Sequence, residues 1–106
     1  MHEGDPDRVD RVAGPEDAAR RAVLPANRAL DRSYEEFRRH RDTAVPEHAG
    51  TWVTAEGARV AGDAARGYTV HWLHPAPAGF ECEALVSISP TGEIEVVKAW
   101  ATYSPD

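Results

Sequence analysis

Cysteine is almost absent from this chain, because Cys82 is the only one in 106 residues. An internal disulfide is therefore excluded. A chain of this length can bury enough apolar surface for one domain without a disulfide or a structural metal, and it leaves no room for a second domain of ordinary size. Cys82 stands among alternating apolar residues, which predicts a buried thiol rather than a reactive one.

Long apolar runs are also missing, so the sequence offers neither the hydrophobic region of a signal peptide nor a segment that could span a bilayer. We therefore expect a cytoplasmic protein with no membrane partner. The net charge is −6 with neutral histidines, which argues against a general affinity for nucleic acid or for anionic membrane surfaces.

Catalytic signatures are absent as well: there is no glycine-rich phosphate loop, nucleophile elbow, cysteine pair or HExxH motif. The best candidates for a catalytic or metal-binding cluster are His71, His74, Glu81 and Glu83, whose side chains are of types that zinc accepts as ligands. Residues three apart on a strand point to opposite faces, so the two histidines converge only if the strand bends at its end. We predict no metal and no cofactor, and keep His71, His74 and Glu81 as candidates for acid–base catalysis.

The clearest feature that is present is a long β-hairpin over residues 79–103. Pro90 and Gly92 favour a turn whose loop is residues 90–92. Continued without interruption, this turn pairs Ile88 with Ile94, Val86 with Val96, Ala84 with Lys98 and Cys82 with Trp100. The predicted core face is Phe80, Cys82, Ala84, Val86, Ile88, Ile94, Val96 and Trp100, with Lys98 as its only charge.

The opposite face of the same hairpin is predicted to be acidic near the turn and small or apolar further along. It consists of Glu81, Glu83, Leu85, Ser87, Glu95, Val97, Ala99, Ala101 and Tyr103. Apolar patches with a polar rim mark protein contacts, and small side chains permit close packing of two sheets. We therefore predict a binding surface, for a protein partner or for a second copy in a homodimer, at Leu85, Val97, Ala99, Ala101 and Tyr103.

A long helix is predicted to begin at Pro15 and to end before Ala44. Its apolar stripe is Ala19, Val23, Ala26, Leu30, Tyr34, Phe37 and Arg41, spaced by three and four residues. Pro25 interrupts the backbone hydrogen bonding but not the phase of the stripe, which predicts one kinked helix or two nearly collinear helices on a single surface. The opposite side of the helix is rich in arginine with acidic residues interleaved, which predicts a solvated face.

The remaining segments complete an α+β domain over residues 15–106. Residues 1–14 have the composition of a disordered acidic tail. Strands are predicted at 51–54 and 68–74, whereas residues 55–67 are compatible with either a weak strand or a turn. The order predicts one helix packed on a three- to four-stranded antiparallel meander. In outline this resembles cystatin-like and small NTF2-like folds, and the resemblance implies only a helix cradled by a curved sheet.

Two hypotheses of function follow. The first is a small cytoplasmic, non-enzymatic interaction module that binds a protein partner or itself through the outer sheet face; an immunity or inhibitor protein is one version. The second is a small-molecule binding or catalytic pocket between helix and sheet, lined by Trp72, Trp100, Lys98 and His71. In the alternative to this pocket, the tryptophans simply fill the core, and the stem of Lys98 lies along its edge.

Overall fold

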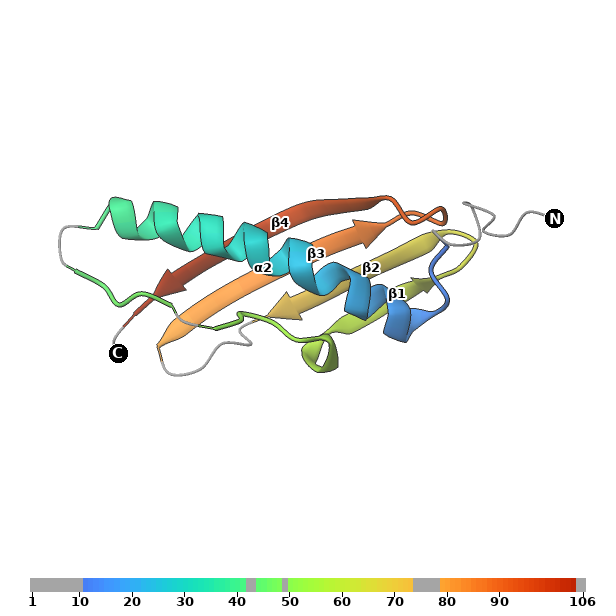
Figure 1. The fold of residues 1–106 in the computed structure, drawn as a ribbon, viewed down its shortest axis with the longest axis horizontal. Coiled ribbons are helices and arrows are strands. Elements are labelled where there is room, and N and C mark those ends of the chain that lie inside the picture. Colours follow the sequence, from blue (N-terminus) through green and yellow to red (C-terminus); the bar gives the residue numbers. More distant parts are fainter. Residues whose placement is uncertain (1–10, 42–43, 49, 74–78, 105–106) are drawn as a thin grey trace.

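The computed structural model describes residues 11–41, 44–48, 50–73 and 79–104. One long helix lies across one face of a four-stranded antiparallel sheet, which confirms the α+β class predicted from the sequence (Figure 1). The strands are ordered β1-β2-β3-β4, so each strand pairs with the next one along the chain. The helix covers only one side of the sheet, and the two sides therefore have different surroundings.

Helix α2 (Pro15–Arg39) begins where proline occupies the first turn and two acids complement the positive end of the dipole. It continues through Pro25 as a single helix. Its buried apolar residues are Ala18, Ala19, Ala22, Ala26, Leu30 and Tyr34. The predicted stripe extends too far, because a tight turn closes the helix at Arg39 and leaves Arg41 exposed beyond it.

The chain just before α2 is also part of the packed structure. Val12 is buried in the core, and the N–H of Ala13 donates to Asp17 Oδ2 at 2.9 Å. This hydrogen bond is the main reason that the pKa of Asp17 is lowered, and Arg20 and Arg21 add to the effect. The predicted boundary at residue 15 therefore leaves out Val12, while residues 1–10 of the predicted tail lie outside the described part.

Residues 51–54 do not form the predicted strand. Trp52 and Val53 are buried, but their backbone groups pair with the side chain of Asn27 rather than with a neighbouring strand. Asn27 Oδ1 accepts the N–H groups of Trp52 and Val53 at 2.7 and 3.0 Å, and its Nδ2 donates to Val53 O at 3.1 Å. The side chain of Asn27 thus takes the place of a neighbouring strand as the hydrogen-bond partner. The strand propensity of residues 51–54 gives no sign of this.

The segment that the sequence left open, residues 55–67, contains a short 3₁₀ helix, η1 (Ala55–Gly57), and strand β1 (Arg59–Asp63). A turn in which Asp63 Oδ1 accepts two backbone N–H groups leads into β2 (Gly67–Leu73). β2 confirms the strand predicted at 68–74, although His74 lies outside the described residues. β1 is the edge strand beside β2, and all of its residues except Val60 are exposed.

The central hairpin consists of β3 (Phe80–Ile88) and β4 (Ile94–Tyr103). Its turn is the predicted one: the N–H of Ser89 donates to Glu93 O at 2.8 Å, and Gly92 has a left-handed φ of 91°. The predicted register holds for the first two pairs, Ile88–Ile94 and Val86–Val96. The register then shifts, so that Leu85 pairs with Lys98, Ala84 with Ala99, Glu83 with Trp100 and Cys82 with Ala101.

Val97 is therefore the extra residue of a β-bulge, and the predicted faces of β4 are wrong beyond it. A shift of one residue exchanges the two faces of a strand. Ala99, Ala101 and Tyr103 turn to the side covered by α2, and Ala101 is 1% exposed. Trp100 and Lys98 turn to the opposite side, contrary to the prediction. The alternation of apolar and polar residues gives no sign of a bulge.

The two edges of the sheet differ. At β4, Ala101 donates its N–H to Ser33 Oγ of α2 at 3.0 Å, so the helix reaches over this edge. At β1, no backbone hydrogen bond joins the strand to any described segment other than β2. The edge of β1 is thus open to a further strand.

Candidate functional site

The outer face is the side of the sheet turned away from α2. Two of the rows of side chains that the register places across it are central: Arg59, His71, Leu85 and Lys98 form one row, and Leu73, Glu83 and Trp100 form the next. No other described helix or strand lies over this face (Figure 1). Among the described residues the outer face is therefore left uncovered, and its side chains come from all four strands.

Glu83 lies at the centre of the outer face and is bound by three side chains. His71 Nε2 lies 2.9 Å from Glu83 Oε2, and Trp100 Nε1 donates to Glu83 Oε1 at 2.9 Å. The ammonium group of Lys98 lies 3.5 Å from Oε2. The side chain of Glu83 is only 17% exposed, since these neighbours from β2 and β4 surround it.

The pKa of Glu83 is lowered from 4.5 to about 2 by the hydrogen bonds from His71 and Trp100, with a smaller contribution from the charge of Lys98. The carboxylate is therefore ionised at neutral pH, and both of its oxygens already accept hydrogen bonds. Such a group is suited to holding its neighbours in place rather than to accepting a proton from a substrate.

Apolar side chains surround this network on the outer face. Leu73 and Val97 are 50% and 53% exposed, and Leu85 and Trp100 are partly exposed. Large exposed apolar side chains grouped around a satisfied polar centre are typical of protein contact surfaces. Glu81 and Glu95 lie on the rim and make no ion pair with any described residue.

The structure separates the residues that the sequence analysis grouped together. Leu85 and Val97 lie on the outer face as predicted, whereas Ala99, Ala101 and Tyr103 lie on the inner face. His71, Lys98 and Trp100, predicted for a pocket under the helix, lie on the outer face. Trp72 is buried on the inner side, where its Nε1 donates to Thr54 O at 2.8 Å.

The structure does not bring together the remaining candidates for acid–base catalysis. Glu81 is exposed on β3, and His74 lies outside the described residues. Within the described ranges, no three histidine, cysteine, aspartate or glutamate side chains are placed to hold a metal ion. Arg59 and Leu73 are outer-face residues that were not predicted. Residues 55–67 gave no clear signal for β1, which carries Arg59, and the strand at 68–74 was predicted without an assignment of Leu73 to a face.

A second group of aromatic side chains lies near the end of α2. His48 stacks on Trp52 with ring centroids 3.6 Å apart, and Tyr34 donates its hydroxyl to Pro46 O at 2.5 Å. Burial lowers the pKa of His48 and raises that of Tyr34. Both rings are thereby kept neutral, and they anchor the segment after the helix to the core.

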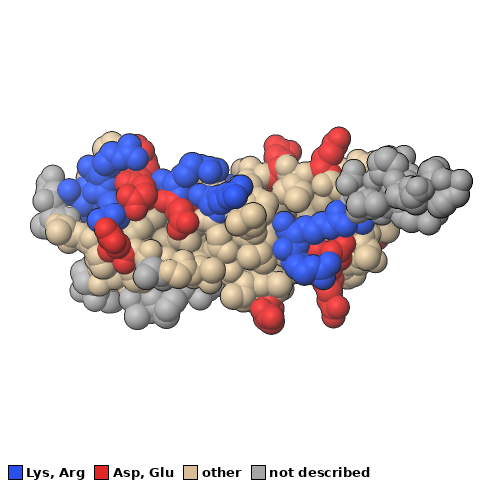
Figure 2. All heavy atoms as spheres, in the orientation of Figure 1, with Lys and Arg blue, Asp and Glu red and all other residues tan. Residues whose placement is uncertain are grey.

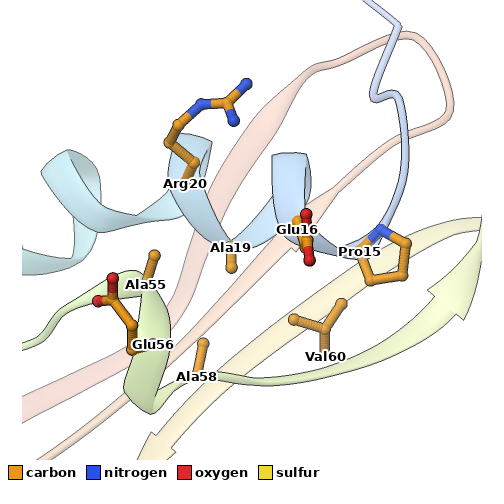
Figure 3. A pocket seen from close by; sticks show the side chains of 8 residues that line it. All are labelled: Pro15, Glu16, Ala19, Arg20, Ala55, Glu56, Ala58 and Val60. Atoms are coloured by element: carbon orange, nitrogen blue, oxygen red, sulfur yellow. The ribbon is translucent and has the colours of Figure 1, made fainter.

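A groove of about 530 Å³ lies between the first turns of α2, η1 and β1 (Figure 3). Its lining residues are Pro15, Glu16, Ala19, Arg20, Ala55, Glu56, Ala58 and Val60. None of the four residues predicted for a pocket belongs to it. The groove and the outer face are therefore separate surfaces.

Charge is unequally divided between the helix and the rest of the chain. Residues 11–41 carry eight arginines and five acids, whereas residues 44–104 carry seven acids and three lysine or arginine residues. Figure 2, which views the molecule from the helix side, shows the basic side chains gathered near the two ends of α2 beside acidic ones. This mixture agrees with a solvated helix face.

Comparison with protein-family models, with curated proteins and with solved structures found no match for this chain. The cystatin-like or NTF2-like outline is accordingly not confirmed beyond a helix on an antiparallel sheet. The helix of the described chain is not long and apolar enough to cross a membrane.

Proposed function

We propose that this chain is a small, non-enzymatic interaction module that binds a protein partner through its outer sheet face, as an immunity or inhibitor protein does. The observation that carries the proposal is the uncovered face on which Leu73, Leu85, Val97 and Trp100 surround the Glu83 network. A network of fixed side chains holds Trp100 in one orientation before binding, which reduces the entropy lost on association. Trp is also among the residues that most often dominate binding energy.

The acidic residues on the rim of the outer face favour a partner whose contact surface has basic residues around an apolar centre. Glu83 already pairs with Lys98 and His71, while Glu81 and Glu95 on the rim pair with no described residue. Their carboxylates would attract lysine or arginine side chains and accelerate association at low salt.

A second copy of this chain fits the outer face less well. Arg59 and Lys98 lie at opposite ends of the same cross-strand row. In an aligned sheet-on-sheet dimer with its two-fold axis parallel to the strands, Arg59 of one copy would face Lys98 of the other. Like charges brought together in this way oppose such a dimer.

The test uses two charge substitutions on the outer face, Leu73→Glu and Val97→Glu, and one matched substitution on α2. Leu24 is 57% exposed on the opposite side of the molecule, so Leu24→Glu introduces the same charge at a similarly exposed leucine. Binders would be selected with the wild-type chain from a displayed library of natural protein fragments, and their affinities measured for all three variants.

We expect each outer-face substitution to weaken binding by about tenfold or more, and Leu24→Glu to change it by less than about twofold. The affinity should also fall with rising salt. Binders that tolerate both outer-face variants, or a dimer in sedimentation equilibrium that Leu73→Glu dissociates, would contradict the proposal. Ala101 is unsuitable for this test, because it is buried and a charge there would unfold the domain.

A further inference from the structure

The groove beside β1 has an apolar floor and a charged mouth. Ala19, Ala55, Ala58 and Val60 supply small and branched apolar side chains, while Glu16 on α2 and Glu56 on η1 stand at its two sides (Figure 3). Its volume of about 530 Å³ falls in the range of ligand pockets in proteins. The groove is therefore large enough for a long side chain together with part of its backbone.

The free charge at this groove is negative. Glu16 and Glu56 are exposed, and neither forms an ion pair with a described residue. Arg20, the one base in the lining, pairs with Asp17 and extends away from the groove in Figure 3. A ligand here would gain from a positive charge near the mouth and an apolar stem on the floor.

The same groove adjoins the open edge of the sheet. β1 pairs with β2 alone among the described segments, and in antiparallel pairing every second residue directs its N–H and C=O groups away from the partner strand. Val60 belongs both to this strand and to the lining of the groove. An extended chain that pairs with β1 could therefore place a side chain in the groove.

We propose that the groove is a second binding site, which takes an extended peptide segment of a partner protein. The segment adds to β1 as a fifth strand of the sheet, and one of its lysine or arginine side chains enters the groove between Glu16 and Glu56. Backbone pairing supplies affinity in this mode, and the groove supplies selectivity for the basic side chain. This site is separate from the outer face, so either can exist without the other.

The experiment uses the full chain and a short end-blocked peptide of alternating valine and threonine with a central lysine. Comparison peptides carry glutamate at the centre, or keep the lysine but have N-methyl groups on the backbone amides of one edge. Binding is measured by titration, and its place is found from amide chemical shifts. Glu16→Gln, Glu56→Gln and their combination are compared with Glu93→Gln, which alters an exposed acid at the β3–β4 turn.

We expect the lysine peptide to shift the amides of β1 and η1. Each glutamine variant at the groove should weaken binding about threefold and the double variant about tenfold, whereas Glu93→Gln should stay within about twofold. The glutamate peptide and the N-methylated peptide should bind at least tenfold more weakly, since one lacks the charge and the other cannot pair with a strand.

The proposal is overturned if the lysine peptide does not bind, or if its shifts fall on β3 and β4 instead. It is equally overturned if the N-methylated peptide or free butylammonium binds as tightly as the lysine peptide. In that case the groove would be a site for small organic cations rather than for an added strand.

Discussion

At the scale of single residues, two side chains form hydrogen bonds that secondary-structure propensity and hydrophobic periodicity do not predict. Asn27 satisfies three backbone groups of Trp52 and Val53, and Glu83 is bound by His71, Lys98 and Trp100. In both cases the partners lie far apart in the sequence. Their convergence depends on packing and register, which is why the sequence placed Glu83 on the outer face and among metal-ligand types but did not reveal its partners Lys98 and Trp100.

The lowered pKa of Glu83 predicts a pH dependence of stability. The pKa is about 2 in the folded chain and 4.5 for an ordinary carboxyl group, so folding favours the ionised form. This contribution is fully present above pH 4.5 and is lost as the pH falls from 4.5 toward 2. In Glu83→Gln, urea unfolding over this range should therefore show a weaker loss of stability than in the wild type.

Glu81→Gln is the control for this measurement, because Glu81 lies on the same face of β3 but outside the network. It should keep the slope of the wild type between pH 4.5 and 2. A slope that is the same in Glu83→Gln and in the wild type would show that the network does not hold the carboxylate in its ionised form. The lowered pKa of Asp17 makes the same contribution to the pH dependence of stability in all variants, so it cancels in the differences between them.

At the scale of elements, most of the fold could be predicted. The stripe from Ala19 to Phe37 identified the helix, and Pro90 and Gly92 identified the turn of the hairpin, because these signals are local. The bulge at Val97 could not be predicted, since two consecutive valines are compatible with a regular strand as well as with a bulge. Every error in the predicted binding surface on β4 follows from that one residue.

Deletion of Val97 tests the importance of the bulge. Without it, Val96 still pairs with Val86 and Lys98 with Leu85, so a regular ladder forms and both faces of β4 are kept. We therefore expect the free energy of unfolding to change by less than about 2 kcal/mol. Deletion of Ala99 instead removes the bulge by placing Lys98 opposite Ala84 on the buried side, so we expect the free energy of unfolding to fall by about 2–5 kcal/mol. Urea denaturation followed by circular dichroism measures this change.

Val97→Ala is the matched control, because it keeps the residue count and alters an exposed side chain. It should change the free energy of unfolding by less than about 1 kcal/mol. If deletion of Val97 destabilises the chain as much as deletion of Ala99, Val97 is not the residue that sets the register of β4.

At the scale of the whole molecule, the core between α2 and the sheet surrounds the single thiol. Cys82 is 0% exposed and has apolar neighbours on β3, as the sequence predicted. Since the chain has one cysteine, its reaction with a thiol reagent reports how often the entire core opens.

We expect Cys82 in the folded chain to react with Ellman's reagent about a thousandfold or more slowly than in urea, because few molecules of a stable domain are open at any moment. The Cys82→Ala/Val97→Cys variant moves the thiol to an exposed site and should react at nearly the unfolded rate. Rapid reaction of Cys82 under native conditions would mean that the sheet and helix separate locally without unfolding.

The hydrogen bonds of the three tryptophan indoles also give the molecule an optical reporter of each side of its sheet. Trp52 donates to Asp31 and Trp72 to Thr54 beneath the helix, whereas Trp100 donates to Glu83 on the outer face. A molecule that docks on the outer face would shield Trp100 and shift its fluorescence emission while leaving the other two unchanged. In a variant with phenylalanine at positions 52 and 72, binding could thus be followed without any attached dye.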